Sequence, residues 1–333
     1  MEHLNKRKSL CNFGHYDNFK PMIKEIYFAG GCFWGVEHFF KSVHGVVSAC
    51  PGYANGNLDN PSYEQVYTDK TGHAETVRIQ YDAARISLQE LTRLFFATID
   101  PVQKDGQGHD IGTRYRTGVF YKEQEDLPVL QAEFARQRTL LAAEDPAAVF
   151  CPELVPLKAF YPAEEYHQKY LDKNPGGYCH LDFKVFVYRD LYQDAKALLE
   201  GEPDPVARMA EVAALVHERM KFFWTGFYRV LPAVESGTEL VLGPFQGPAA
   251  CLRIPYGRGV CGTAWKQART IVVPDVEKFP GHIACSSLSR SEIVVPVFAQ
   301  DGTVTAVLDI DSKELGTFDR TDAAFLQLVV ALL

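Results

Sequence analysis

The sequence predicts an α+β protein of two domains, and three observations lead to this prediction. The chain has 333 residues, which is more than one ordinary hydrophobic core serves and about right for two domains. With 47% hydrophobic and 23% charged residues, it has the composition of a folded globular protein. In both halves, segments with strand periodicity occur together with helical segments, and glycines and prolines separate them. We therefore expect each half to form a sheet with flanking helices.

The predicted first domain covers residues 23–192 and follows a polar, flexible tail of residues 1–22. The segment YFAG at 27–30 indicates a short strand, and apolar residues then recur at helical spacing over 33–43. The segment TGHAETVRIQY at 71–81 alternates as a strand does. These elements predict a mixed sheet with helices against it.

The predicted second domain covers residues 193–333 and opens with a helix. Asp204 is the expected N-cap of this helix and Pro205 its first residue. A closing helix is expected from about Arg320. Between these helices lie four strand-like runs, ELVLGPF, TIVVPDV, SEIVVPVF and VTAVLDIDS.

Charge and hydropathy exclude several classes of protein. The net charge of -8 leaves no basic face for nucleic acid. No segment has the roughly 18 consecutive apolar residues of a membrane span, and the start of the chain lacks the apolar run of a secretory signal. We therefore expect a cytoplasmic protein. In that reducing compartment the eight cysteines favour catalytic or metal-binding roles over structural disulfides.

Cys32 lies between the predicted strand at 27–30 and the helix that follows it. Free backbone N–H groups and the helix dipole at such a turn favour a thiolate, which is the nucleophilic form of cysteine. The sequence therefore predicts a nucleophile in GGCFWG. A small buried core cysteine is the alternative.

Several polar residues could assist such a nucleophile. Glu75 shares one strand face with Val77, Ile79 and Tyr81, and a carboxyl on an apolar face has a raised pKa and stays protonated. The alternative is a shifted register with Glu75 in solvent. Tyr63, Asp110 and Tyr115 could hydrogen-bond a polar oxygen, although each alone is more often structural than functional.

Cys179 follows a predicted helix that ends at NPGG, residues 174–177. A cysteine on a mobile glycine-rich segment can reach a distant sulfur, as a resolving thiol must. A surface cysteine without a role is the alternative. We expect Cys50 and Cys151 to be core or loop residues and Cys11 to lie in the tail.

Five blocks of this half, GCFWG, GYANG, PSYEQVYTDKTGHAE, HDIGTRYR and NPGGYCH, resemble peptide methionine sulfoxide reductase A in order and spacing over residues 24–187. The resemblance implies that Cys32 attacks the sulfoxide sulfur and that Glu75 protonates its oxygen. It also implies that a sulfenic acid on Cys32 condenses with Cys179, and that thioredoxin reduces the resulting disulfide. It further implies that the sulfoxide oxygen is bound with the help of Tyr63, Asp110 and Tyr115. Finally, it implies that Phe33 and Trp34 enclose the S-methyl group.

The second half carries Cys251, Cys261 and Cys285 beside glycine-containing loops, which suggests dithiol chemistry. Because no two of them form a CxxC pair, a structural zinc site is the weaker alternative. Strand alternation places Asp309 and Asp311 on one face, where they repel each other unless a cation lies between them. A metal ion or the ammonium of a free amino acid would serve, and Glu292 could join them. The alternative is an exposed sheet face with solvated carboxylates.

These segments, with FFWTGFY, LVLGPFQGPAAC and PGHIAC, resemble free methionine-R-sulfoxide reductase, an enzyme with a GAF fold, from Leu198 to the end. The resemblance implies that Cys285 is the nucleophile, with Cys251 as the main resolving thiol and Cys261 as a second participant. It implies that substrate is held by the carboxyls Glu292, Asp309 and Asp311 and by the aromatic rings of Trp224 and Tyr228. One departure is visible: Ser286 and Leu288 stand where a more acidic and smaller pair is expected.

The two resemblances together imply a methionine sulfoxide reductase A fold followed by a GAF domain, in one bifunctional enzyme. The first half is expected to reduce the S epimer, protein-bound and free, and the second half the R epimer of free methionine sulfoxide. We expect thioredoxin as reductant, no bound cofactor or metal, and a GAF-mediated homodimer as one arrangement that the resemblance allows. A GAF ligand sensor that regulates the first half is the main alternative, and a thiol peroxidase the weaker one.

Overall fold

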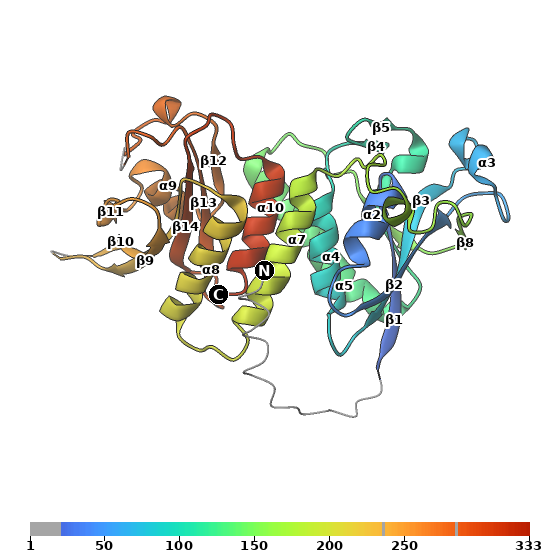
Figure 1. The fold of residues 1–333 in the computed structure, drawn as a ribbon, viewed down its shortest axis with the longest axis horizontal. Coiled ribbons are helices and arrows are strands. Elements are labelled where there is room, and N and C mark those ends of the chain that lie inside the picture. Colours follow the sequence, from blue (N-terminus) through green and yellow to red (C-terminus); the bar gives the residue numbers. More distant parts are fainter. Residues whose placement is uncertain (1–20, 235–236, 284–285) are drawn as a thin grey trace.

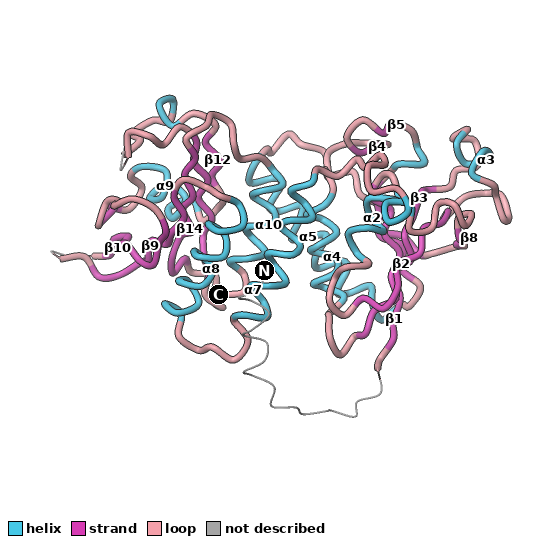
Figure 2. Tube along the Cα trace, viewed as in Figure 1, coloured by secondary structure: helices cyan, strands magenta, loops and turns pink. Residues whose placement is uncertain are grey.

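The computed structural model describes residues 21–234, 237–283 and 286–333. Within these residues the chain forms two six-stranded sheets with helices between and around them (Figures 1 and 2). The prediction of an α+β fold in two halves is confirmed. The predicted tail lies outside the described residues except for residues 21 and 22.

The first sheet is mixed, as predicted, because β6 and β7 pair in parallel and all other neighbours are antiparallel. In spatial order its strands are β7 (Glu153–Pro156), β6 (Thr117–Tyr121), β1 (Ile23–Gly30), β3 (Ala74–Asp82), β2 (Val46–Ala54) and β8 (Phe160–Pro162). Its helices are α2 (Phe33–Phe40), α3 (Tyr63–Tyr67), α4 (Leu88–Thr98), α5 (Leu127–Glu144), α6 (Tyr170–Lys173) and α7 (Phe183–Leu198). A small hairpin of β4 (Gly106–Gln107) and β5 (Asp110–Ile111) lies beside them.

The second sheet is antiparallel throughout. In spatial order its strands are β11 (Arg253–Pro255), β10 (Thr238–Gln246), β9 (Trp224–Pro232), β14 (Val304–Ser312), β13 (Ser291–Phe298) and β12 (Ile271–Val273). Four of these six are the strand-like runs expected from the sequence, and β9 and β11 were not expected. The helices of this half are α8 (Pro205–Met220), α9 (Gly259–Gln267) and α10 (Arg320–Val330).

The predicted start of α8 is confirmed in atomic detail. The Asp204 side chain accepts a hydrogen bond of 2.8 Å from the backbone N–H of Ala207, and Pro205 is the first helical residue. The closing helix α10 begins at Arg320, also as predicted.

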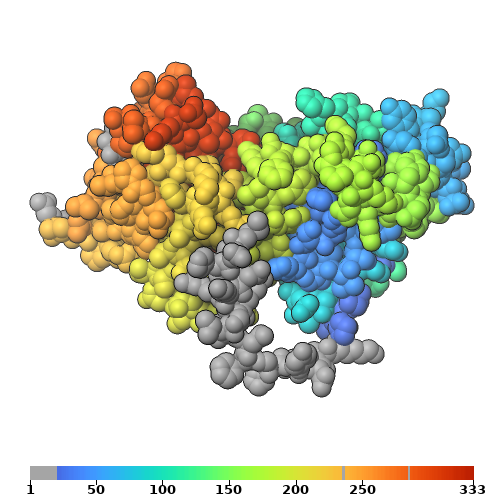
Figure 3. All heavy atoms as spheres, viewed as in Figure 1, coloured from blue at the N-terminus to red at the C-terminus, as the bar shows by residue number. Residues whose placement is uncertain are grey.

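A layer of helices joins the two halves (Figure 1). Helix α10 of the second half packs against α4 and α7 of the first half, and α7 packs against α8. The rings of Tyr188 and Phe325 stack with centroids 5.4 Å apart, and Phe39 lies 6.2 Å from Phe325. One cluster of buried apolar residues therefore runs through both halves. Figure 3 shows the halves packed side by side.

The expected boundary between residues 192 and 193 lies inside α7, which continues to Leu198. Its buried face extends past this point, since Leu191, Tyr192 and Ala195 are all buried. The helical periodicity therefore gives no sign of a boundary there.

Hydrogen bonds to charged groups also connect the two halves within this helix layer. Lys184, in the first turn of α7, donates hydrogen bonds to Asp319 and Asp322 at the start of α10, at 2.5 and 2.9 Å. The buried Tyr188 hydroxyl donates to Asp322 at 2.8 Å.

No helix in the described part of the chain is both long and apolar enough to span a bilayer.

Candidate functional site

Cys32 lies between the end of β1 and the start of α2, as predicted. Gly31 makes the turn with φ of +83°, and a Cβ at this residue would lie only 2.7 Å from the Cβ of Gln107. Both facts require glycine here. Cys32 is the N-cap residue of α2 and is only 4% exposed.

The structure does not favour a resting thiolate at Cys32, so this prediction is wrong. Burial raises the pKa of the Cys32 thiol well above its usual value, and the nearby carboxyls of Glu75 and Asp110 raise it further. The backbone N–H of Trp34 acts in the opposite direction but does not outweigh them. The helix terminus therefore contributes less than the low-polarity surroundings.

Glu75 lies on the buried face of β3, as predicted, and is 2% exposed. Its Oε2 accepts a hydrogen bond of 3.1 Å from the backbone N–H of Phe33, the residue after Cys32. Burial raises the pKa of Glu75 to about 8. The carboxyl is therefore largely protonated at neutral pH and can act as a proton donor.

The predicted tyrosines face the same space as Cys32 and Glu75. Burial, Glu75 and Cys32 together raise the pKa of Tyr63 to about 12. Burial and Glu75 also raise the pKa of Tyr115. Both hydroxyls stay protonated and can donate hydrogen bonds to an oxygen bound between them and Glu75.

The predicted aromatic pair is held by residues that the sequence interpretation missed. Trp34 stacks on Tyr170 with centroids 3.7 Å apart and donates from Nε1 to Nδ1 of His167 at 3.1 Å. The Phe33 ring packs 5.1 Å from His167 and 5.9 Å from Tyr53. These contacts fix the two rings beside Cys32.

Glu164 organises the next set of contacts. It accepts hydrogen bonds from the Tyr53 hydroxyl at 2.7 Å and from the backbone N–H of Tyr63 at 2.8 Å. Tyr53 lies within the block GYANG, so the resemblance could have identified it. Glu164, His167 and Tyr170 lie outside every quoted block, and only the tertiary packing brings them to the site.

Cys179 lies in the loop between α6 and α7, not on a free tail. It is partly buried against α2, where a Cβ on Gly35 would lie 3.1 Å from its sulfur, and burial raises the pKa of its thiol. The next residue, His180, has a ring nitrogen within 4.8 Å of the Cys32 sulfur, which places this loop beside Cys32. The adjacent His180 packs on the same turn, with Nε2 3.0 Å from the carbonyl of Gly30.

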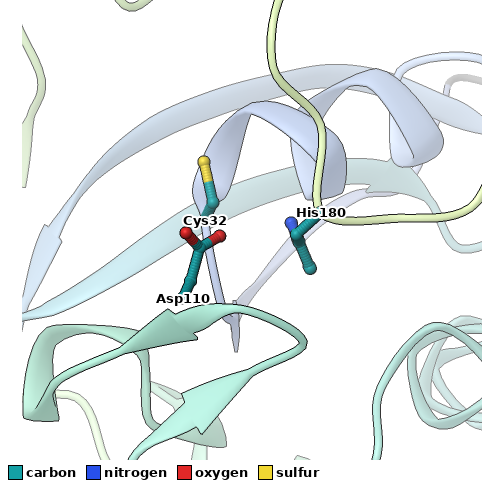
Figure 4. A group of neighbouring side chains, drawn as sticks. All are labelled: Cys32, Asp110 and His180. Carbon is teal, nitrogen blue, oxygen red and sulfur yellow. The ribbon is translucent and has the colours of Figure 1, made fainter.

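His180 joins Cys32 and Asp110 in one group whose ligand atoms all lie within 4.8 Å of one another. Figure 4 shows the three side chains close together, at the start of α2, on the β4–β5 hairpin and on the loop before α7. The sequence interpretation did not select His180, although it lies within the block NPGGYCH.

The second predicted site is a pocket in the other half, with about 540 Å³ of space that is partly open to solvent. It brings together all but two of the site residues predicted for this half. The predicted residues that line it are Trp224, Tyr228, Cys261, Glu292, Asp309 and Asp311, and Ser286 and His282 line it as well. Strand register explains this grouping, because Glu292 pairs with Asp311 and Asp311 pairs with Trp224.

The three carboxyls are on a covered face, so the alternative of an exposed sheet is wrong. Burial raises the pKa of Glu292 and of Asp309, and the charge of Asp311 raises both further. Asp309 also raises the pKa of Glu292, whereas a hydrogen bond with Glu292 lowers that of Asp309. Burial raises the pKa of Asp311 to about 6. The Cys261 sulfur lies 3.9 Å from Glu292 Oε1, and burial raises the pKa of its thiol. Buried carboxyls with raised pKa values thus surround a thiol here as well.

Aromatic groups close the pocket. Trp224 stacks on Phe245 with centroids 5.5 Å apart and donates from Nε1 to the carbonyl of Pro248 at 3.0 Å. The Tyr228 hydroxyl donates to the carbonyl of Cys251 at 3.0 Å, and Cys251 is itself disulfide-bonded. Cys285, the predicted nucleophile, lies outside the described residues.

Comparison with known proteins agrees with this division. Residues 24–197 match the family model for peptide methionine sulfoxide reductase, and residues 204–333 match that for the GAF domain. The chain is 50% identical over 159 residues to the peptide methionine sulfoxide reductase MsrA of Clostridium acetobutylicum, covering 48% of this chain and 95% of the relative. It is 53% identical over 146 residues to GAF domain-containing protein A of Dictyostelium discoideum, covering 44% and 89%.

Solved structures resemble each half. One is the free methionine-R-sulfoxide reductase of Neisseria meningitidis in complex with its substrate, with 50% identity, coverage of 45% of this chain and 88% of that chain, and a TM-score of 0.43. Another is methionine sulfoxide reductase A of Corynebacterium diphtheriae, with 33% identity, coverage of 48% and 79%, and a TM-score of 0.45.

Proposed function

Since this chain belongs to the peptide methionine sulfoxide reductase family, we propose that its first half reduces the S epimer of methionine sulfoxide, in proteins and free. We propose that its second half, a GAF domain, reduces the R epimer of the free amino acid. The observation that carries the first proposal is the buried, protonated Glu75 beside the Cys32 thiol in an aromatic-lined site. The corresponding observation for the second is the carboxyl-lined pocket around Cys261.

In the first half, Tyr63 and Tyr115 donate hydrogen bonds to the sulfoxide oxygen, and Glu75 gives it a proton. The Cys32 sulfur attacks the substrate sulfur, the hydroxyl group passes to Cys32, and the substrate is released as the thioether. The proton lost from the Cys32 thiol restores Glu75, so that Cys–SH and R₂S=O become Cys–SOH and R₂S. The Cys32 side chain is oxidised and the substrate is reduced.

Cys179 then attacks the sulfenic acid of Cys32. A disulfide forms and the hydroxyl leaves as water with the Cys179 proton. The packing of Cys179 against the first turns of α2 supports this assignment. A dithiol protein such as thioredoxin would return both cysteines to thiols.

In the second half, the nucleophile assigned to Cys285 follows the same sequence of steps, with Cys251 and Cys261 as the recycling thiols. The carboxyls Glu292, Asp309 and Asp311 explain the preference for a free amino acid. One of them donates the proton, and an ionised neighbour binds the substrate ammonium, which a residue inside a peptide lacks. Trp224 and Tyr228 enclose the methyl end.

Separated epimers test the proposal. Purified S and R forms of free methionine sulfoxide are incubated with thioredoxin, its reductase and either Cys32→Ser or Cys285→Ser. We expect Cys32→Ser to lose turnover of the S form only and Cys285→Ser that of the R form only. Unchanged R turnover in Cys285→Ser, or none in the unmodified chain, would show that the GAF half is a sensor.

A further inference from the structure

We propose that Cys32, Asp110 and His180 form a reversible binding site for one soft divalent cation of the Zn²⁺ type when the protein is reduced. The three residues offer sulfur, oxygen and nitrogen ligand atoms within 4.8 Å of one another (Figure 4). Tetrahedral zinc with bonds of about 2.0–2.3 Å holds its ligands roughly 3.5 Å apart. Small side-chain rotations therefore close the group around an ion.

Two of the three ligands carry buried polar atoms without a hydrogen-bond partner in the described structure. These atoms are Oδ2 of Asp110 and Nδ1 of His180. Buried polar atoms are otherwise nearly always paired, because an unpaired one loses its hydration without compensation. A bound cation would supply that partner.

The second nitrogen of His180 adds an independent indication. Its Nε2 lies 3.0 Å from the carbonyl oxygen of Gly30, which can only accept, so Nε2 carries the hydrogen. The unpaired Nδ1 is then the nitrogen with a free lone pair. Metal-binding histidines usually have this arrangement, with one nitrogen donating to a carbonyl or carboxylate and the other bound to the ion.

Charge balance favours a divalent ion in this buried place. On binding, the Cys32 S–H bond breaks, the proton goes to solvent and a sulfur–metal bond forms, with no change in oxidation state. One thiolate and one carboxylate then neutralise the two positive charges. The fourth position of the ion stays open toward the substrate space, as in three-ligand zinc sites.

The second half contains another cluster of possible metal ligands, which can be compared with the first. Among the described residues, the second group of this kind is Cys261, Glu292 and Asp309, which contains no imidazole. Because zinc prefers nitrogen and sulfur ligands, we expect it to occupy the first group before the second.

A bound ion occupies the Cys32 sulfur and the Asp110 oxygen, and thereby excludes a sulfoxide. If the proposed function is right, zinc inhibits turnover of the S epimer and leaves that of the R epimer unchanged. Binding itself does not depend on the proposed function, so the two ideas fail independently.

The test uses the full reduced chain with Co²⁺ as a spectroscopic probe and Zn²⁺ in competition. We expect one equivalent of Co²⁺ to give a thiolate charge-transfer band, which Cys32→Ser removes. Asp110→Asn and His180→Ala should weaken Zn²⁺ binding tenfold or more. Cys50→Ser, the same substitution at a partly buried cysteine away from this group, should change neither quantity. A band that survives Cys32→Ser, or that Cys261→Ser removes instead, overturns the proposal.

A second measurement needs no substitution and therefore does not depend on the folding of a variant. X-ray absorption of the unmodified chain with one equivalent of Zn²⁺ should show one sulfur ligand at about 2.3 Å and nitrogen or oxygen ligands at about 2.0–2.2 Å. A coordination shell without sulfur, or with two or more sulfur atoms, contradicts the assignment.

Discussion

The buried carboxyl of Glu75 sets how the first site depends on pH. Burial raises its pKa to about 8, and the acid form is the proton donor. We expect kcat/KM for the S epimer to fall as pH rises through about 8 in the unmodified chain. Glu75→Gln should lower kcat/KM by about 10²- to 10⁴-fold and abolish this decline. Steady-state rates from pH 6 to 9 measure both effects.

Stability provides the control for this substitution. The folded chain holds the Glu75 proton up to about pH 8, whereas an unfolded glutamate loses it near its usual pKa of 4.5. The stability contributed by this group is therefore fully present below pH 4.5 and is lost as pH rises through 8. Glu75→Gln should be at least as stable as the unmodified chain at pH 9 by urea unfolding. A Glu75→Gln variant that is less stable than the unmodified chain at pH 9 would contradict this stability prediction.

Gly31 permits a comparison between two glycines with almost the same φ. Its φ is +83° and that of Gly302 is +85°, but only Gly31 has a neighbour, Gln107, that a Cβ would strike. We expect Gly302→Ala to cost about 1 kcal/mol from backbone strain and Gly31→Ala about 1–3 kcal/mol more from the clash. Urea unfolding of both variants measures the difference, and equal costs would contradict it.

For single residues, the sequence predicts where a side chain lies better than it predicts the protonation state of that side chain. Strand alternation correctly places Glu75 on the buried face, and the glycines correctly place Cys32 at a turn. The pKa of Cys32 could not be predicted in the same way. It depends on burial by segments far along the chain, including the loop that carries Cys179 and His180, and no local pattern reports that burial.

At the scale of elements, the contact between α7 and α10 is the main addition to what the sequence predicts. Helical periodicity predicts α10, but no helix was predicted over residues 183–198, and periodicity does not report which helix faces meet. The predicted boundary therefore falls inside α7, whose buried face continues past it to Ala195.

The buried hydrogen bond from Tyr188 to Asp322 tests this contact. The exposed bond from Tyr161 to Asp59 has the same chemistry and the same length of 2.8 Å. Tyr188→Phe should lower the free energy of unfolding by about 1–3 kcal/mol, because it leaves a buried carboxylate oxygen without a donor. Tyr161→Phe should lower it by less than about 0.5 kcal/mol. Equal effects in urea unfolding would mean that the interface bond is not buried in solution.

For the whole molecule, the shared hydrophobic cluster predicts that the two halves unfold together. Phe325 is fully buried and contacts Phe39 and Tyr188 of the first half. Phe325→Ala should cost about 3–5 kcal/mol and lower the temperature at which both activities are lost. Phe298→Ala, at an exposed position of β13, should leave that temperature nearly unchanged. Heat inactivation followed with each epimer separately measures both, and a shift confined to R turnover would contradict a shared core.

The helix layer also has a consequence for how such a chain could have arisen. Joining two independent genes end to end would produce two separate domains connected by a flexible linker, each with a polar surface of its own. Here Phe39, Tyr188 and Phe325 form a shared apolar interface, so cutting the polypeptide between α7 and α8 would expose apolar surface on both fragments. In a single-domain relative, we expect hydrophilic side chains at these three positions or a partner that covers them.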